Sequence, residues 1–319
     1  MIEQIDGHVP VLYREVLEHL SLDQDGTPQP RIVVDCTLGL GGHAIGIIRS
    51  LRCDDRFIGI EWDAANLEEA RNRIDAVLDS LSPANRPRVD LVHDSYAHVQ
   101  SICTKLGVIP THALYDLGIS SRHADDGDRG FTWRFPGPLD MRYDRTGRLP
   151  TAKEWLSTVD IERFTSILRE YGEEPHAYGM AKHLLAEHAN TPFETTADLA
   201  ASVSRRSRDR KSILRVFQAV RIAVNGEFDS MRTSIPEILG RLPVGGRISV
   251  ISFHSVEDRI VKHLFAEVTA DEIDNLTGRT SKEAPYRKTT RKPVVPTDAE
   301  ITENPRARSA KLRTLVRIN

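Results

Sequence analysis

The segment from Val33 to His43 constrains the fold of this chain more than any other. Its residues, VVDCTLGLGGH, form an apolar strand that runs into a glycine-rich turn and then into an apolar helix. A second strand ends at Glu61, eighteen residues after His43. In a nucleotide-binding β-α-β unit, an acid at this place holds the ribose hydroxyls. The two strands together predict a site for an adenosine-like ligand.

Short strands alternate with helical patterns over the first 116 residues. The clearest helix runs from Ala65 to Leu78, because Leu67, Ala70 and Ile74 recur at helical spacing on one side. The predicted strands cover residues 32–35, 57–61, 89–93 and 113–116. This alternation predicts an α/β fold in which helices cover both faces of a parallel sheet.

The alternation stops at Leu117. Residues 117–150 are rich in Gly, Pro, Asp and Arg and are too long for an ordinary connection, which predicts a functional loop. Residues 151–206 are predicted to be wholly helical. The expected helix N-caps are Thr151, in a capping box with Glu154, and also Asp160 and Thr196.

The sheet is predicted to resume towards the C-terminus. A long amphipathic helix over residues 213–229 leads into an apolar strand over 247–252. Beyond it we expect a helix capped by Ser255 with Asp258, a mobile basic arm over 270–310 and a closing strand over 312–318. The sheet domain is therefore predicted to comprise residues 1–125 and 212–319, interrupted by an inserted loop and helical subdomain over 126–211.

Composition narrows the class of protein. The chain has 319 residues, a formal net charge of −3 and 39% hydrophobic residues, as expected of a globular fold. No apolar run approaches the roughly 18 residues that cross a bilayer. Residues 1–6 lack a secretory signal, so we expect a cytoplasmic protein. Three cysteines lie far apart without C-x-x-C spacing, which predicts reduced, mostly buried thiols and neither a zinc site nor a disulfide framework: Cys36, Cys53 and Cys103.

Basic charge is concentrated between residues 205 and 221. One acid, Asp209, lies among Arg205, Arg206, Arg208, Arg210, Lys211, Arg215 and Arg221. Such a run is either a solvated helix face or a surface for a polyanion, and the sequence leaves both interpretations open.

The glycine-rich turn does not by itself choose its ligand. Gly39, Gly41 and Gly42 let the backbone approach a ligand closely, and the following helix can present unpaired N–H groups to a carboxylate or phosphate. The spacing also satisfies the looser fingerprint of dinucleotide-binding proteins. Asp35, four residues before Gly39, would repel a pyrophosphate but attract the amino group of S-adenosylmethionine. The segment therefore favours S-adenosylmethionine over a nicotinamide cofactor.

Polar residues end the other predicted strands. Glu61 can accept hydrogen bonds from both ribose hydroxyls, or it can be a solvated strand end. Tyr96 can stack on adenine or simply pack. Asp116 can orient the cofactor or accept a hydrogen bond from a substrate amine, or it can cap a turn. These three residues are candidate ligands at one edge of the sheet.

Cations and aromatic residues interleave in the loop after the fourth strand. Arg129, Phe131 and Trp133 lie close together, and Arg142 continues the segment. Such a loop suits a nucleotide base pulled out of its stack, because aromatic rings give the base a face and arginines meet its phosphates. Packing of Phe131 and Trp133 on the helical insertion is the alternative.

The run Ser252-Phe253-His254-Ser255 does not predict a serine nucleophile. The G-x-S-x-G motif is absent, and neighbours on one strand end do not form a catalytic triad through proximity in sequence. His254 is more simply a residue of the substrate loop or a polar group with a partner of its own.

Taken together, these residues resemble the ribosomal small-subunit RNA methyltransferase H family. Its members are S-adenosylmethionine-dependent enzymes that methylate N4 of a cytidine in the decoding region of 16S rRNA. The resemblance spans nearly the whole chain and rests on residues 8–12, 35–43, 116–121, 129–131, 138–142, 171–174, 217–225, 251–259 and 304–313. It implies a Rossmann-like class I methyltransferase sheet with an inserted helical subdomain.

The resemblance also implies the site. The cofactor would be lined by Gly41, Gly42, His43, Glu61, Tyr96, Asp116 and His123. The substrate would be held by Arg129, Phe131, Trp133, Arg142, Arg221, Asn225 and His254. The chain departs from the family's usual residues at three cofactor positions, with Glu for Asp at 61, Tyr for Phe at 96 and His for Gln at 123. Residues 211–216 also depart from the family pattern, which affects local RNA contacts rather than the reaction.

The expected reaction is attack of the cytosine N4 on the methyl group. Since the N4 lone pair is delocalised into the ring, positioning should supply most of the rate, and Asp116 is the first candidate to accept a hydrogen from the amine. The expected partner is 16S rRNA or the small ribosomal subunit, with roles in rRNA processing and ribosome biogenesis and with no metal and no membrane involved. A nicotinamide-dependent dehydrogenase and a non-catalytic RNA-binding protein remain as alternative functions.

Overall fold

The computed structural model describes residues 10–22, 29–147, 149–273 and 279–319. The chain divides into two compact units, which we call the sheet unit (residues 1–118 and 229–319) and the helical unit (residues 119–228). Of the motif at residues 8–12, His8 and Val9 lie outside the described residues, as does the segment 1–6 in which no signal is expected.

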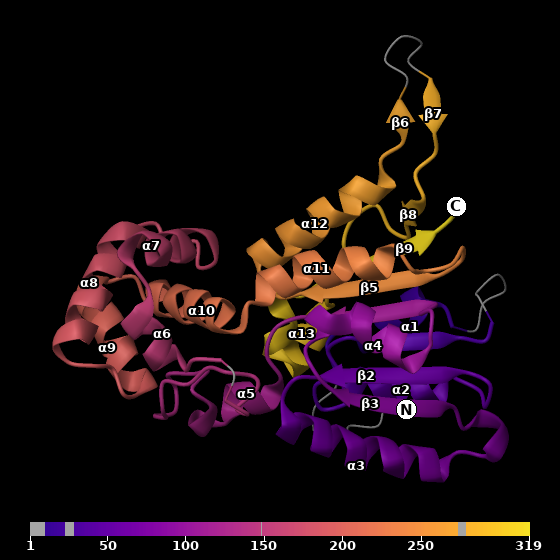
Figure 1. The fold of residues 1–319 in the computed structure, drawn as a ribbon, viewed down its shortest axis with the longest axis horizontal. Coiled ribbons are helices and arrows are strands. Elements are labelled where there is room, and N and C mark those ends of the chain that lie inside the picture. Colours follow the sequence, from indigo (N-terminus) through magenta and orange to yellow (C-terminus); the bar gives the residue numbers. More distant parts are fainter. Residues whose placement is uncertain (1–9, 23–28, 148, 274–278) are drawn as a thin grey trace. The chain divides into compact units, whose positions relative to one another are not determined.

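A seven-stranded sheet forms the centre of the sheet unit, in the order β3-β2-β1-β4-β5-β9-β8 (Figure 1). Its strands are β1 (Ile32–Asp35), β2 (Arg56–Glu61), β3 (Arg88–His93), β4 (His112–Asp116), β5 (Arg247–Ser252), β8 (Tyr286–Lys288) and β9 (Lys311–Arg317). The first five run parallel, whereas β9 is antiparallel to β5 and β8 is antiparallel to β9. The predicted α/β class is confirmed, and the predicted strands agree with the observed ones to within one residue at each end.

The strand order reverses between β1 and β4. The chain moves outwards from β1 to β3 on one side and then returns to the other side of β1 with β4. In open parallel sheets, ligands bind at such a reversal, outside the carboxyl ends of the strands. The topology therefore directs attention to the residues that end β1, β2 and β4.

Helices cover both faces of this sheet. On one face, helices α1 (Tyr13–Leu20), α2 (Gly42–Arg49) and α3 (Ala64–Ser80) pack their apolar sides on strand residues such as Val33, Phe57 and Leu114. Tyr115 points to the opposite face, since neighbouring strand residues alternate. Its hydroxyl group lies near Ser234 of α11 (Glu227–Leu239). Helices α4 (Val99–Leu106) and α12 (Ser255–Thr269) complete the larger helices of the unit.

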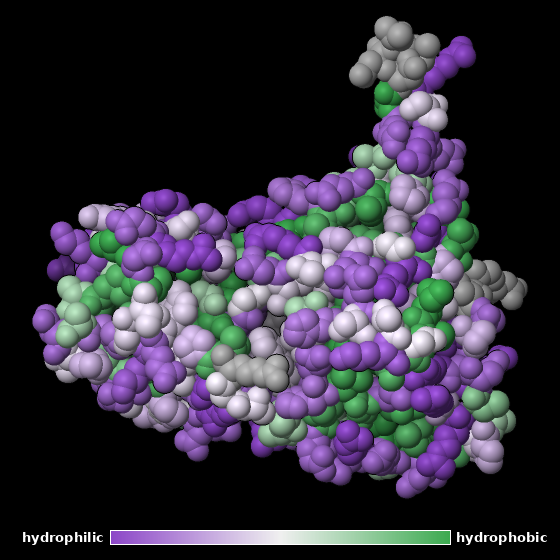
Figure 2. All heavy atoms as spheres, in the orientation of Figure 1, coloured by the Kyte–Doolittle hydropathy of each residue, from purple (hydrophilic) through white to green (hydrophobic). Residues whose placement is uncertain are grey.

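The region 270–310 contains more structure than the predicted mobile basic arm. Strands β6 (Glu272–Ile273) and β7 (Thr280–Lys282) form a hairpin that projects from the sheet unit, and Figure 2 shows that hydrophilic side chains predominate on it. Strand β8 and helix α13 (Asp298–Glu303) follow. The basic composition of this region was interpreted as a mobile arm. Edge strands also commonly carry Lys and Arg, which keep them from pairing with other chains.

Helices make up most of the helical unit. They are α5 (Ser121–Asp125), α6 (Ala152–Thr158), α7 (Ile161–Glu170), α8 (Ala177–Asn190), α9 (Thr196–Arg206) and α10 (Lys211–Asn225). Their shared core includes Phe164, Leu168, Leu184 and Val220, each fully buried. Thr151 and Glu154 form the expected capping box, and Asp160 caps α7 as predicted.

Three local predictions need correction. Thr195, not Thr196, caps α9, and it forms a capping box with Asp198. The single helix predicted over 213–229 is broken at Gly226, whose φ of 61° ends α10 before α11 begins. Helix α12 is capped by His254 rather than Ser255.

The unit boundaries also differ from the predicted 125/126 and 211/212. Helix α10, which the sequence analysis assigned to the sheet domain, buries Val216, Phe217 and Val220 in the core of the helical unit. Its amphipathic pattern predicts a helix but does not say which core receives the apolar face.

Cys53 is exposed, whereas Cys36 and Cys103 are buried as expected.

Candidate cofactor and substrate site

The glycine-rich turn joins β1 to α2 at the carboxyl edge of the sheet. Gly39 and Gly41 have φ of 55° and 83°, a region that favours glycine, and Gly41 is the N-cap of α2. A Cβ atom added to Gly42 would lie 2.6 Å from Cγ of Pro10. Side chains are therefore disfavoured at Gly39 and Gly41 by the backbone conformation and at Gly42 by the close approach of Pro10.

Glu61, at the end of β2, is bonded to this turn. Its carboxyl oxygens accept hydrogen bonds from the backbone N–H of Gly39, at 2.7 Å, and of Asp63, at 2.8 Å. Burial of the carboxyl group raises the pKa of Glu61 to about 8, although these N–H groups favour its charged form. Glu61 thus lies beside the turn and holds it in position, and its contact with ribose stays a prediction.

Asp35, His43 and Asp116 converge at the ends of β1, α2 and β4. Nε2 of His43 lies 3.5 Å from Oδ2 of Asp116, and the ring of Tyr13 stacks on His43 with 6.1 Å between centroids. Oδ1 of Asp35 accepts a hydrogen bond from the N–H of Thr37 at 3.1 Å. Burial raises the pKa of Asp35 to about 7, and the neighbouring His43 opposes that rise.

Several buried polar atoms of this cluster have no hydrogen-bond partner among the described residues. They are both ring nitrogens of His43 and Oδ1 of Asp116. The His43 side chain is only 5% exposed. A buried polar atom left without a partner costs about 1–3 kcal/mol, so native proteins rarely keep one without a reason. These atoms point to a ligand with polar groups of its own.

Tyr96 follows β3 at the same edge. Its half-buried ring packs edge-to-face on Tyr115, with 5.7 Å between centroids. Six of the seven predicted cofactor residues therefore belong to the sheet unit, at the ends of its strands or directly after them. Contact of Tyr96 with adenine stays a prediction, since the ring already has a packing partner.

The seventh, His123, belongs to the helical unit. It is 2% exposed and lies between two aromatic rings, 4.8 Å from Phe131 and 5.2 Å from Tyr143. The Phe131 ring is 6% exposed and packs against Tyr143 at 5.3 Å. This burial favours the packing alternative for Phe131. Trp133 is half-buried and meets Phe217 edge-on at 5.1 Å.

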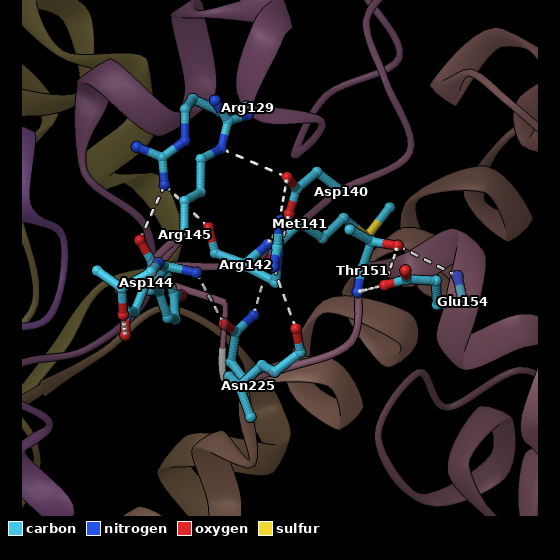
Figure 3. A network of polar contacts seen from close by, with 12 residues as sticks. Arg129, Asp140, Met141, Arg142, Asp144, Arg145, Thr151, Glu154 and Asn225 are labelled. Carbon is cyan, nitrogen blue, oxygen red and sulfur yellow. Dashed lines mark hydrogen bonds and ion pairs between the residues drawn. The ribbon is translucent and has the colours of Figure 1, made fainter.

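A network of polar contacts fixes the segment from Asp140 to Tyr143 in the helical unit (Figure 3). Arg129 donates to the carbonyls of Arg142, at 2.8 Å, and of Tyr143, at 3.0 Å. Asp140 accepts two hydrogen bonds from the Arg142 guanidinium, at 2.8 and 3.1 Å. Asn225 accepts from the N–H of Tyr143, at 2.9 Å, and donates to the carbonyl of Met141, at 2.7 Å.

This network holds a strained backbone. Met141 has a φ of 61°, which is rare for a residue with a side chain and persists only where the surroundings hold it. Three predicted substrate residues, Arg129, Arg142 and Asn225, therefore build the segment that carries Tyr143. Their direct contact with a substrate stays a prediction.

The remaining two predicted substrate residues also have structural partners. Arg221 forms a paired contact with Glu227, at 2.8 and 3.0 Å. His254 caps α12, because its Nδ1 accepts from the N–H of Glu257 at 3.3 Å. The Glu257 side chain completes the capping box. A substrate role for either residue therefore also stays a prediction.

Sequence analysis missed Tyr13 and Tyr143. Tyr13 stacks on His43 from a helix that precedes the first strand, and Tyr143 is the only half-buried ring in the stack with His123 and Phe131. Tyr143 directly follows the motif at 138–142, which is a signal that could have drawn attention to it. Tyr13 likewise directly follows the motif at 8–12, but its contact with His43 depends on helix packing.

Within the described ranges, no helix combines the length and hydropathy needed to span a membrane. Those same ranges hold no group of three or more His, Cys, Asp or Glu side chains arranged to bind a metal ion.

Nearly the whole chain is similar to proteins of one family. A model of the MraW methylase family matches residues 6–318. The ribosomal RNA small subunit methyltransferase H of Thermobifida fusca is 39% identical, over 98% of this chain and 93% of the relative. The protein with the same description in Symbiobacterium thermophilum is 38% identical, over 98% and 96%. A solved putative methyltransferase from Streptococcus mutans, in complex with SAH, covers 98% of this chain and 100% of its own at 12% identity and a TM-score of 0.42, too distant to inform the site.

Proposed function

Because the chain belongs to the MraW methylase family, we propose that it transfers a methyl group from S-adenosylmethionine to N4 of a cytidine in the decoding region of 16S rRNA. The observation that carries this proposal is the match to the family model over residues 6–318. The relatives from Thermobifida fusca and Symbiobacterium thermophilum, described as small subunit rRNA methyltransferases, are similar over nearly their whole length. The partner would be the small ribosomal subunit or its RNA, in the cytoplasm.

The residues at the carboxyl edge of the sheet fit S-adenosylmethionine. The cofactor would bring an amino and a carboxylate group to a cluster in which His43 and Asp116 have buried atoms without hydrogen-bond partners. Its ribose hydroxyls would meet Glu61, which lies beside the glycine-rich turn. When bound, the cofactor supplies an electrophilic methyl group on a sulfonium centre.

The chain's own residues would hold the nucleophile. Oδ1 of Asp116 has no partner in the described structure, and the strand end is fixed by a hydrogen bond from its N–H to Oγ1 of Thr37 at 2.5 Å. A carboxylate held in this way can accept a hydrogen bond from an exocyclic amine and turn its lone pair towards the methyl group. The helical unit would recognise the RNA, with the segment carrying Tyr143 as a rigid part of that surface.

The buried Asp35 weighs against a nicotinamide-dependent dehydrogenase. It lies at the glycine turn, where the two phosphates of a dinucleotide would otherwise sit, and a carboxylate there repels them. A purely RNA-binding role would leave the buried atoms of His43 and Asp116 without a purpose.

The direct test is methyl transfer to RNA. Small subunits from cells lacking this protein, incubated with the protein and methyl-labelled S-adenosylmethionine, should gain label at one cytidine. Asp116→Asn should lower that rate about 10²- to 10⁴-fold, the range for losing a positioned proton acceptor, with the fold intact by circular dichroism. No incorporation by the wild-type protein, together with calorimetric binding of NAD, would overturn the proposal.

A further inference from the structure

The corner between α9 and α10 contains the basic run of residues 205–215, and two of its arginines are already neutralised. Arg205 pairs with Glu187 at 2.5 Å, and its hydrogen bonds hold the pKa of Glu187 at about 2. Arg215 contacts Asp209 at 2.8 Å and Glu174 at 3.7 Å. These pairs fasten the corner to α8 and to the turn before it, so they explain part of the run in structural terms.

The other arginines of the corner are left exposed. Arg208 and Arg210 form no ion pair with any residue in the described part of the chain. Arg206 donates through Nε to the carbonyl of Gly179 at 3.3 Å. Three guanidinium groups therefore face solvent without a carboxylate partner over five residues.

Gly179 lets Arg206 lie directly against the helix backbone. A Cβ atom at this position would be 2.5 Å from one terminal nitrogen of the Arg206 guanidinium. The glycine thus creates a seat that fixes the direction of a charged side chain. Holding a long surface arginine in one orientation costs side-chain entropy, which a simple solvated face does not require.

The residue before Gly179 on α8 carries an exposed aromatic ring. Tyr178, the chain neighbour of Gly179, is 58% exposed. It has no ring or hydrogen-bond partner among the described residues. Lys182, one helical turn further along α8, is also exposed. A bare aromatic face beside a seated guanidinium and further cations is the combination that binds single-stranded nucleic acid, through stacking on a base and contacts with phosphates.

We propose that Tyr178, Arg206, Arg208 and Arg210 form an RNA contact surface on the helical unit, which we call the Tyr178 surface. The arginines bind consecutive phosphates, and one unpaired base stacks on Tyr178. The inference rests on the proposed function for the identity of its partner. The Tyr178 surface is distinct from the cluster of His43, Glu61 and Asp116, because its four residues belong to the helical unit and that cluster belongs to the sheet unit.

Charge and aromatic character together favour RNA over an acidic protein. Three arginines without carboxylate partners attract any polyanion, but a polypeptide carboxylate gains nothing from an exposed ring. A nucleotide uses both features at once. The two contributions can be separated, because phosphate contacts depend on salt concentration and stacking does not.

The experiment compares three variants of the full chain. Arg208→Gln with Arg210→Gln removes two exposed charges, Tyr178→Ala removes the ring, and Arg163→Gln with Arg169→Gln is the matched control on α7, where both arginines are exposed in the same unit. Binding of a fluorescent fragment of 16S rRNA is measured by anisotropy over a series of salt concentrations. Calorimetry with S-adenosylmethionine checks the cofactor site.

The double arginine variant should bind RNA more weakly, and its slope of log affinity against log salt should become shallower by about 1.4 to 1.8. Each phosphate that is no longer neutralised accounts for about 0.7 to 0.9 of this change. Tyr178→Ala should weaken binding roughly 5- to 150-fold with the slope unchanged. The control and the cofactor affinity should match wild type. Equal weakening in the control variant, or equal effects on binding to polyglutamate, would overturn the Tyr178 surface.

Methyl transfer distinguishes this inference from the function on which it rests. If wild-type protein methylates RNA but the variants bind and methylate as wild type does, only the Tyr178 surface fails. If wild-type protein neither binds nor methylates RNA, the proposed function fails and the surface fails with it. A raised KM with an unchanged kcat in the variants supports a docking role.

Discussion

The carboxyl edge of the sheet and the loop that carries Tyr143 differ in how their polar groups are used. At the sheet edge, His43 and Asp116 bury polar atoms that have no partner among the described residues, and burial raises the pKa of Asp35. In the loop, Arg142 and Asn225 each have several partners within hydrogen-bond distance. Both regions carry the residue types expected of a binding site.

This difference indicates that the sheet edge is a binding site, whereas the polar network around Met141 is a structural support. Buried polar atoms without partners destabilise the empty protein and become favourable only when a ligand supplies the hydrogen bonds. A network whose hydrogen bonds are already made instead stabilises one backbone conformation, here the strained Met141. Substitutions at the sheet edge should therefore affect binding, and substitutions in the loop should affect stability.

The largest effect is expected at Phe131. Phe131→Ala should lower the free energy of unfolding by about 3–5 kcal/mol, because the ring is 6% exposed and packs on His123 and Tyr143. Urea unfolding followed by circular dichroism measures this. The control is Trp133→Ala, whose half-buried ring should cost less. A Phe131→Ala protein with wild-type stability but a ten-fold drop in methyl transfer would instead make the ring a stacking surface for the base.

A smaller effect, on binding rather than folding, is expected at the sheet edge. Glu61→Ala should weaken S-adenosylmethionine binding by about 1–3 kcal/mol, since the ribose hydroxyls lose a buried hydrogen-bond partner. Isothermal calorimetry measures the affinity. Because Glu61 also accepts from the N–H groups of Gly39 and Asp63, Glu61→Asp serves as the control, since it keeps a carboxyl group with two acceptor oxygens. Unchanged affinity in a folded Glu61→Ala protein would remove Glu61 from the cofactor site.

A pH dependence of stability is also expected of the ligand-free protein. Burial raises the pKa of Asp35 from 3.8 to about 7 and that of Glu61 from 4.5 to about 8, so the folded state holds these protons more tightly than the unfolded state. The resulting stability is present below the unfolded pKa values and is lost as pH rises through 7 to 8.

The measurement is Tm by calorimetry between about pH 5 and pH 8, at constant ionic strength. The wild-type Tm should fall over this range more than that of an Asp35→Asn, Glu61→Gln double variant. Parallel curves for the two proteins would show that neither carboxyl group is responsible. This outcome would also weaken the contrast between the two regions, since the sheet edge would then carry no destabilised acids.

Much of the sheet unit could be predicted from local pattern. Strands β1, β2 and β4 are short, largely apolar runs bounded by turns, and the acids at positions 35, 61 and 116 lie at strand ends because the apolar runs stop there. Parallel strands bring their carboxyl ends to one edge, so adjacency of these residues follows from the fold class alone. The predicted cofactor residues of the sheet unit are accordingly found together.

The roles of residues in the helical unit were harder to predict, because the same residue types that bind RNA also form internal contacts of the fold. An arginine that binds a phosphate and one that binds a carbonyl look alike in sequence, and Arg129 proved to have carbonyl partners. The same holds for Phe131, whose ring packs in the core. Helix α10 likewise shows an apolar face without showing which core it joins.

The sequence by itself determined the α/β class, the glycine turn and the acids that follow the strands, because each depends on the conformational preferences and hydropathy of neighbouring residues. Only the tertiary structure decided which polar groups are already partnered. Tyr13 reaches His43, and Asn225 holds the backbone around Met141, across long separations in the chain. Such contacts depend on how helices and loops pack. Packing brings together residues that lie far apart in the sequence, and the local pattern around each residue does not indicate which other residue it will contact.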